Sequence, residues 1–302
     1  MKKWQKRLIQ IVTGVVIIIL ITNLGMAFYL NSQINKVRHT HLPCVEETPL
    51  DWGFNPGDYQ NISFQSLDGL NLVGIFFPVE HPKAVIVVSH GAADRSCAEF
   101  MLPLAKPLVD QGYSVMLITL RNYGQSEGNL TSFGRQEWQD VAGAVVWVEN
   151  QAVGVPIYLM GISMGGATVL TAASQGYGQA LVLLVPYTRD VPAITWRASQ
   201  QTGIPENLFL VPATLAVWAE WGVTNDSQPF DYAGQVEIPT LIIGGRRDHI
   251  LPPREMPALQ QAIGNNAQLV WTEGRHNLVR EDETVRAEVI QYTVEFFNQL
   301  PN

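Results

Sequence analysis

The sequence is poor in cysteine and in charge. Two cysteines in 302 residues exclude a disulfide-rich scaffold, and their spacing does not fit a structural zinc site. Charged residues make up only 15% of the chain, but 47% is hydrophobic, which excludes an intrinsically disordered protein. No internal repeat or low-complexity segment occurs. These absences leave a globular protein, and the residues from 58 to 302 suffice for one large domain.

Acidic residues are absent from the start of the chain. Six of the 19 cations precede residue 39 and no acid does, so the remaining 13 cations face all 27 acids, a net charge of −14. A strongly acidic body repels phosphate backbones. The sequence therefore predicts no nucleic-acid partner.

A long apolar run without charge spans residues 8–30. It is long enough to cross a hydrocarbon layer of about 30 Å. Four cations precede it (Lys2, Lys3, Lys6 and Arg7), whereas only Lys36 and Arg38 follow closely, so the positive-inside rule places residues 1–7 in the cytoplasm and the body outside. We therefore expect a signal anchor. A cleaved signal peptide and a secreted body is the alternative, because Gly25-Met26-Ala27 offers small residues for cleavage.

Residues 31–57 are polar and then marked by prolines, with neither helical nor strand periodicity. We expect a juxtamembrane spacer there. Residues 58–302 then show apolar strands alternating with helices after an opening hairpin around Asp68-Gly69. Continuous apolar strands indicate burial on both faces of a mostly parallel sheet. The predicted class is α/β, with strands at 84–88, 114–118, 157–160, 180–185, 240–243 and 268–271 and helices at 95–111, 135–150, 164–175, 253–263 and 282–299.

One connection, residues 187–236, is about twice as long as its neighbours. Its aromatic content is too high for a free loop. We expect two helices that form a lid over the carboxyl edge of the sheet, where α/β proteins bind ligands. The lid and pocket candidates are Trp196, Phe209, Trp218 and Trp221.

A Gly-x-Ser-x-Gly string, residues 161–165, lies between a predicted strand and a predicted helix. In that context a sharp turn holds the serine, here Ser163, with its hydroxyl exposed. Gly161 and Gly165 are needed because a Cβ there would crowd the neighbouring strand and helix. The chance alternative is an ordinary serine at a helix cap.

A serine hydroxyl needs an oriented base. His276 follows the last predicted strand in a polar loop, and Asp248 follows the preceding strand, so both reach the same sheet edge as Ser163. They are the candidate base and its orienting acid. The backbone N–H groups of Ala92 and Met164 are the candidate oxyanion donors. His90 and Gly91 organise the loop before Ala92, and His90 lies on the wrong strand to be the base.

These motifs in register resemble the α/β-hydrolase superfamily, in its single-domain branch of esterases, lipases and serine-aminopeptidase-like enzymes. The resemblance covers residues 58 to 300 and includes His90-Gly91, Arg121-x-x-Gly124-x-Ser126, the 161–166 turn and Gly274-x-His276-Asn277. It implies an eight-stranded sheet and the chain order Ser, Asp, His. Thr119 and Val185-Pro186-Tyr187 depart from the family's usual residues. These departures concern the subfamily and the shape of the pocket and do not touch Ser163, Asp248 or His276.

The sequence thus predicts a membrane-anchored serine hydrolase that cleaves a small-molecule acyl ester and needs no metal or organic cofactor. A peptidase or thioesterase of the same fold is the alternative, and a non-catalytic binding module is a third. The oligomeric state is not indicated. For Cys44 and Cys97 a bridge and two unpaired thiols both stay open; we favour unpaired thiols, because spacing alone cannot bring the two Cα atoms within about 7 Å.

Overall fold

Eight strands form a single sheet in the computed structural model, which describes residues 2–92, 95–222 and 227–300. Its order is β1-β2-β4-β3-β5-β6-β7-β8; β2 is antiparallel to β1 and β4, and β3 to β8 run parallel. The opening hairpin and the α/β class are confirmed. The strands are β1 (Gln60–Gln65), β2 (Asn71–Phe77), β3 (Val85–Ser89), β4 (Ser114–Thr119), β5 (Ile157–Ile162), β6 (Ala180–Leu184), β7 (Thr240–Gly245) and β8 (Ala267–Thr272).

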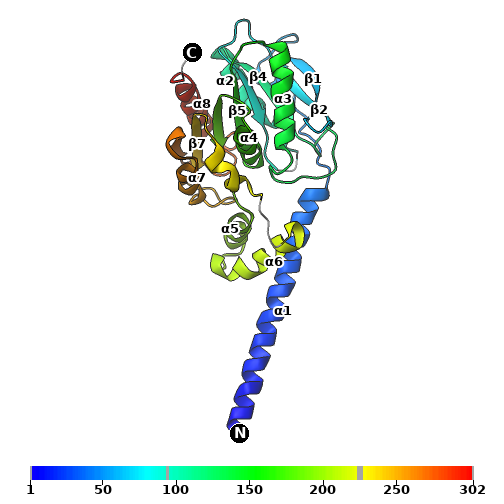
Figure 1. Cartoon of the computed structure of the whole chain (residues 1–302), viewed down its shortest axis with the longest axis vertical. Coiled ribbons are helices and arrows are strands. Elements are labelled where there is room, and N and C mark those ends of the chain that lie inside the picture. The colour runs from blue at the N-terminus through cyan, green and yellow to red at the C-terminus, as the bar shows by residue number, and fades with distance from the viewer. Residues whose placement is uncertain (1, 93–94, 223–226, 301–302) are drawn as a thin grey trace.

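Helices cover both faces of this sheet (Figure 1). One core cluster joins the strands to α2 and α8, and the other joins them to α3, α4 and α7. Every residue of β3 to β7 is buried, which is the two-sided burial that the continuous apolar strands predicted. These helices are α2 (Leu102–Asp110), α3 (Trp138–Gln151), α4 (Met164–Ser174), α7 (Glu255–Ile263) and α8 (Glu283–Phe297), with short 3-10 turns η2 (Ala98–Met101) and η5 (Gly264–Asn266).

The long connection between β6 and β7 contains two α-helices, as predicted, although residues 223–226 lie outside the described residues. They are α5 (Asp190–Thr202) and α6 (Leu210–Trp221), with 3-10 turns η3 (Glu206–Phe209) and η4 (Pro229–Gln235). In Figure 1 α5 and α6 lie beyond the body, on the side from which the N-terminal helix extends. We call the segment 187–222 the lid.

The N-terminal helix α1 runs from Lys3 to His39. It contains the predicted span 8–30, but the expectation that residues 31–39 lack helical structure is wrong. The reason is tertiary: α6 packs along α1, and Asn31, Asn35 and Arg38 bind α6. These partners lie far away in sequence and leave no local periodic signal.

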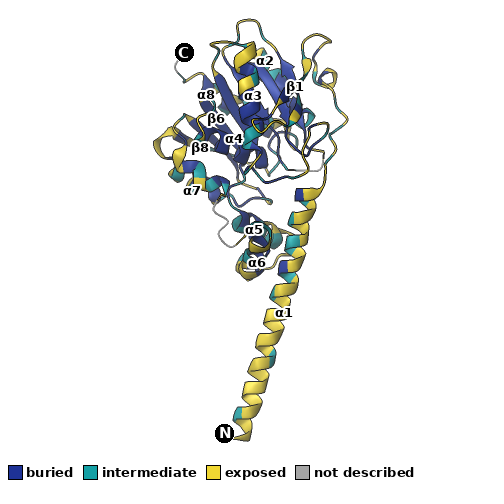
Figure 2. Cartoon of the chain, turned by 45° about the vertical axis from the view of Figure 1, so that its right-hand side comes forward, coloured by how far each residue is buried: buried dark blue, intermediate teal, exposed yellow. Residues whose placement is uncertain are grey.

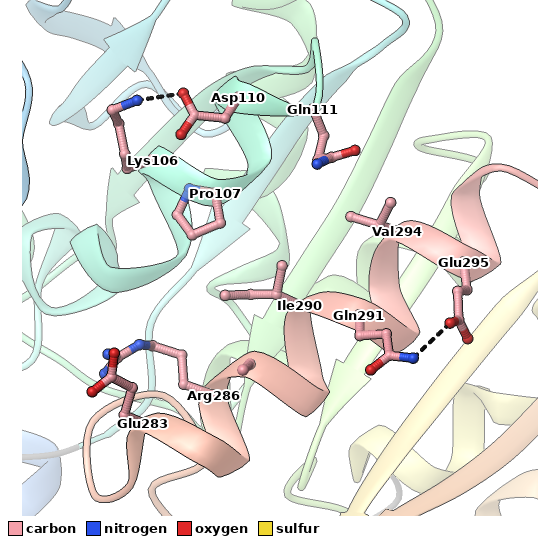
Figure 3. Close-up of a pocket in the computed structure, with 11 residues that line it drawn as sticks. Lys106, Pro107, Asp110, Gln111, Glu283, Arg286, Ile290, Gln291, Val294 and Glu295 are labelled. Atoms are coloured by element: carbon pink, nitrogen blue, oxygen red, sulfur yellow. Dashed lines mark hydrogen bonds and ion pairs between the residues drawn. The ribbon is translucent and has the colours of Figure 1, made fainter.

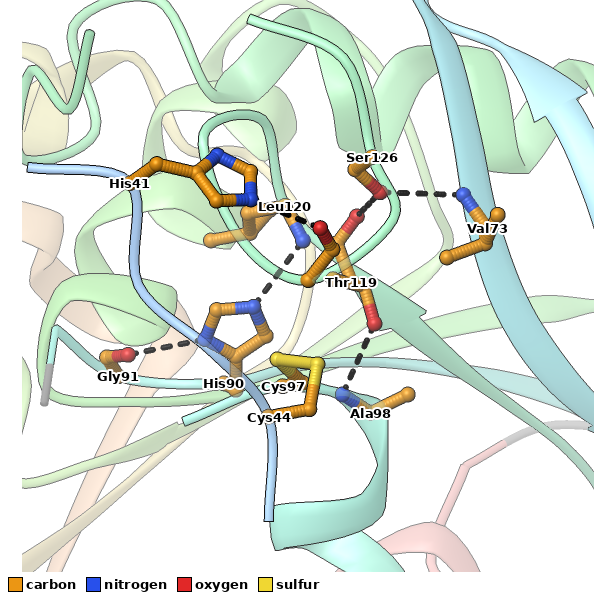
Figure 4. The surroundings of a disulfide bond; sticks show 11 residues. His41, Cys44, Val73, His90, Gly91, Cys97, Ala98, Thr119, Leu120 and Ser126 are labelled. Carbon is orange, nitrogen blue, oxygen red and sulfur yellow. Dashed lines mark hydrogen bonds between the residues drawn. A yellow bond between two sulfur atoms is a disulfide. The ribbon is translucent and has the colours of Figure 1, made fainter. Parts of the chain in front are cut away.

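Residues 40–57 run along the body and contain one turn, η1 (Pro49–Trp52). Leu42 forms a parallel bridge with Tyr123, and Cys44 forms another with Arg95. These contacts bring the Cα atoms of Cys44 and Cys97 to 5.3 Å, and the two sulfurs are bonded (Figure 4). The preference for unpaired thiols is therefore wrong, because backbone pairing, which spacing does not reveal, places the two cysteines together.

Candidate active site

Ser163 occupies the turn between β5 and α4. Its φ of 56° is positive, an unfavourable conformation for a residue with a Cβ. A Cβ on Gly161 would lie 2.2 Å from the Gly165 carbonyl oxygen, and one on Gly165 would lie 2.3 Å from that of Ser89. Glycine at these two positions therefore permits the close approach of β5, α4 and the end of β3.

Two further side chains from neighbouring strand ends meet Ser163. His276 follows β8 and its Nε2 lies 2.9 Å from Ser163 Oγ, while its Nδ1 lies 2.8 Å from Oδ2 of Asp248, which follows β7. The three residues predicted separately from the sequence thus form one hydrogen-bonded chain. This chain gives a hydroxyl, a base and a carboxylate in the order that proton transfer from the hydroxyl requires.

Asp248 is buried, and its second carboxylate oxygen is also occupied. Oδ1 accepts hydrogen bonds from the backbone N–H groups of Ile250 (2.8 Å) and Leu251 (2.9 Å). Its carbonyl oxygen accepts one from the Trp196 indole at 3.2 Å, so the lid touches the acid's backbone. The carboxylate that faces His276 therefore has a fixed orientation.

The candidate oxyanion donors lie on both sides of Ser163. Met164 is the first residue of α4, where backbone N–H groups have no partner within the helix. A Cβ on Gly91 would lie 3.2 Å from the Ser163 Cβ, so the loop that carries Ala92 passes directly over the serine. The geometry is compatible with both donors, whose role stays a prediction.

His90 is fully buried and belongs to this loop rather than to the hydrogen-bonded chain. Its Nδ1 lies 2.9 Å from the Gly91 carbonyl oxygen, and its Nε2 accepts the N–H of Leu120 at 3.0 Å. Burial lowers the pKa of His90 to about 4, because the charged imidazolium loses its hydration, although the Gly91 carbonyl acts in the opposite direction. A neutral His90 thus joins the end of β4 to the loop over Ser163.

The four lid aromatics have different surroundings. Trp196 binds the Asp248 carbonyl, as described above, and Phe209 is buried. Trp218 is 42% exposed, and Trp221 has the guanidinium carbons of Arg38 and Arg135 at 3.7 and 4.0 Å from its ring centroid. Within the described residues, Trp196 is the one of the four that hydrogen-bonds to a member of the Ser163–His276–Asp248 chain.

A buried polar cluster beside Ser163 was missed by the sequence analysis. The Tyr187 N–H donates to the Ser163 carbonyl at 2.9 Å, and the Tyr187 hydroxyl binds Asp190. Asp190 in turn pairs with Arg135 at 2.6 Å. These residues come from β6–α5 and from the segment before α3, and no spacing motif links them. The sequence therefore carries no local signal that would have brought Arg135 and Asp190 together.

Two other features do not contribute to this site. A groove between α2 and α8, lined among others by Pro107, Ile290 and Val294, contains none of Ser163, Asp248 or His276 (Figure 3). Within the described ranges, Cys44, Cys97 and Glu99 are close enough to share a metal ion, but the two sulfurs are bonded to each other and so are not thiolate ligands.

The chain matches two known protein families. Residues 80–225 match the family described as serine aminopeptidase, S33, and residues 212–295 match the family described as TAP-like protein. Together these matches extend from the strand before the His90 loop to α8. The first description is that of a family of hydrolytic enzymes.

Individual proteins similar to this chain agree with the family matches. The uncharacterized protein YfhR of Salmonella typhimurium is 27% identical over 217 residues, covering 67% of this chain and 68% of its own. Human monoglyceride lipase is 35% identical over 138 residues, 42% of this chain and 45% of its own. An esterase of Pyrococcus furiosus superposes with a TM-score of 0.71 at 21% identity, over 87% of this chain and 99% of its own. With the sheet order and the Ser163 turn described above, these matches establish that the chain is a hydrolase of the α/β-hydrolase superfamily.

Proposed function

We propose that the protein is a membrane-anchored carboxylic ester hydrolase. The observation that carries this proposal is the chain from Ser163 Oγ through the His276 imidazole to the Asp248 carboxylate, with distances of 2.9 and 2.8 Å. The similarity to a lipase and to an esterase supports an ester as the substrate.

The mechanism follows from the contacts. His276 Nε2 takes the proton of Ser163 as Oγ attacks the acyl carbonyl carbon. Asp248 holds the imidazole in the tautomer with a proton on Nδ1 and stabilises the imidazolium that forms. The N–H groups of Ala92 and Met164 donate to the oxyanion of the tetrahedral intermediate. His276 then protonates the leaving alcohol, and water attacks the acyl-enzyme by the same route and releases the acid.

A peptidase is the second candidate, favoured by the serine aminopeptidase family match. An exopeptidase would need an acid that is available to hold a free amine. Three lid acids are engaged with arginines: Asp190 with Arg135, Glu206 with Arg254 and Glu220 with Arg38. These pairs favour the ester hydrolase.

The membrane anchor belongs to the same proposal. Helix α1 is long and apolar enough to cross a bilayer, with a mean hydropathy of 2.4 in its most apolar window, as an anchor or a signal sequence would be. The cations before residue 8 and the bond between Cys44 and Cys97 support a body outside the cytoplasm. Retention of the full-length chain in carbonate-washed membranes, with the body cut from intact cells by trypsin, would test this topology.

A fluorophosphonate probe tests the enzymatic proposal. The wild type should be labelled and Ser163→Ala should not. A panel of p-nitrophenyl esters should be hydrolysed, whereas aminoacyl p-nitroanilides should not. Preference for the anilides would replace the esterase by the peptidase, and failure of the folded wild type to react with the probe or any substrate would overturn both.

A further inference from the structure

The lid exposes apolar side chains that the proposed catalysis does not use. Helix α6 carries no charge before Glu220, and none lies between Glu206 and Glu220. One side of α6 is buried through Ala213, Ala216 and Val217. On its other side Leu210, Val211 and Trp218 are 47%, 59% and 42% exposed, and Leu208 of η3 is 61% exposed. A helix that is apolar all round needs an apolar neighbour on every side.

The position of α6 on α1 identifies that neighbour. Two residues of α1 are buried, Ala27 within the apolar run and Arg38 at its polar end. Residues of intermediate exposure recur with helical spacing along the same face: Asn23, Met26, Leu30, Asn31, Ile34 and Val37. At the polar end of this face Asn31 donates to the Ala216 carbonyl at 3.3 Å, and Arg38 pairs with Glu220. Because α6 packs along α1, the lid reaches the last turns of the apolar segment 8–30.

The depth at which α6 lies in the bilayer follows from the geometry of α1. A span of 23 residues is roughly 34 Å long, which leaves little excess over a hydrocarbon core of about 30 Å. The buried Ala27 lies three residues inside the end of the run, or about 5 Å along the axis. Any element that covers α1 from Ala27 to Leu30 therefore lies within the outer part of the bilayer. Both cartoon views agree, with α6 beside α1 and both lid helices beyond the body (Figures 1 and 2).

We propose that the apolar edge of the lid, formed by Leu208, Leu210, Val211 and Trp218, is seated in the outer leaflet of the membrane that α1 spans. The occupant of this edge is the lipid surface itself. The ion pair and amide contacts of α1 hold α6 at that depth. Trp196 of the same lid hydrogen-bonds to the Asp248 carbonyl, so the lid that contacts lipid also contacts the catalytic site. The substrates of Ser163 then include acyl esters dissolved in the bilayer.

This inference rests on the proposed anchor, and depth-dependent quenching separates the two. Val211→Cys is labelled with an environment-sensitive fluorophore in the full chain, whose own cysteines are bonded to each other and do not react. The chain is reconstituted in phosphatidylcholine vesicles that contain nitroxide lipids, with the spin label near the headgroup or near the chain end. Leu208→Cys in η3 is a second lid position, which serves if the change in α6 disturbs folding.

Two matched sites calibrate the experiment. Val153, 86% exposed in the loop before β5, lies at the opposite edge of the sheet and should remain unquenched. Ile17, in the middle of α1, should be quenched most by the deep nitroxide. The lid labels should lose at least about half of their emission to the shallow nitroxide, since interfacial helices bury their apolar face roughly 5–10 Å deep.

The outcomes are distinct. If the lid labels are as little quenched as the Val153 label while the Ile17 label is quenched, the lid is not inserted and the anchor stays intact. Coverage of α6 by a second copy of the chain would give this result. Absence of quenching at Ile17 would overturn the anchor as well. Neither result depends on ester hydrolysis.

Discussion

Arg38 at the end of the N-terminal helix forms a buried ion pair with Glu220 at the end of the lid helix α6. Their side chains are 10% and 6% exposed. The Arg38 guanidinium also lies 3.7 Å from the Trp221 ring centroid, and the Arg38 carbonyl accepts the Thr131 N–H at 2.8 Å. The pair therefore joins the helix that emerges from the proposed membrane span to both the lid and the body.

Glu220→Ala should destabilise the contact between α1 and α6. A buried pair that loses one partner leaves an uncompensated charge, with a typical cost of about 3–5 kcal/mol. The lid should then be cut by protease in the segment around Gly203 at concentrations that leave the wild type intact. Glu237→Ala, which removes an exposed glutamate outside the lid helices, is the control. Equal proteolysis of both variants would show that Arg38 and Glu220 do not hold the lid.

Replacement of the catalytic candidates should separate their roles. Ser163→Ala and His276→Ala should each lower kcat by roughly 10⁶-fold, and Asp248→Asn by roughly 10⁴-fold, because the oxyanion donors and the pocket remain. All three variants should retain the circular dichroism of the wild type. Steady-state hydrolysis of a p-nitrophenyl ester provides the measurement.

His249 is the matched control for the base. It adjoins Asp248 and is exposed, whereas His276 contacts both Ser163 and Asp248. His249→Ala should keep near wild-type activity. If His249→Ala lost activity and His276→Ala kept it, the assignment of the base would be wrong.

Acidification should destabilise the body through His90. Burial lowers the pKa of His90 from 6.5 to about 4, so between these values the unfolded chain binds a proton that the folded chain does not. Stability is therefore unaffected by His90 above pH 6.5 and falls as the pH drops toward 4, by on the order of 3 kcal/mol for the full shift.

Two measurements check the behaviour of His90. In the wild type the His90 ring resonances should show no titration between pH 8 and about pH 5. His90→Asn should flatten the pH dependence of the unfolding free energy across this range. A His90 signal that titrates between pH 8 and pH 5 would show that burial does not lower the pKa of this histidine.

The sequence predicted those parts of the fold and of the site that depend on patterns within a few neighbouring residues. Buried strands, the hairpin and the residues that follow strand ends each have a signature within a few positions, so Ser163, Asp248 and His276 could be named before their distances were known. The helix beyond residue 30, the pairing of Cys44 with Cys97 and the cluster of Arg135, Asp190 and Tyr187 depend on partners from distant parts of the chain. One sequence carries no periodic signal for such contacts.

The bond between Cys44 and Cys97 should stabilise the body and hold the segment after α1 in place. It closes a loop between positions 53 residues apart, which the chain-entropy model values at up to about 4 kcal/mol. A Cβ on Gly124 would lie 2.3 Å from Cys44 Sγ and 3.3 Å from Cys97 Sγ, so the bond is packed against the turn after β4 (Figure 4). The Glu47 carboxylate, three residues after Cys44, pairs with Arg280 at 2.8 Å, and this contact should survive loss of the bond.

Cys44→Ala should therefore lower the unfolding free energy by a few kcal/mol without preventing folding, measured by urea denaturation of the detergent-solubilised full chain. Dithiothreitol should lower the stability of the wild type by a similar amount and leave that of Cys44→Ala unchanged. A wild type insensitive to the reductant, with two alkylated cysteines in protein taken directly from its membrane, would show that the bond does not form.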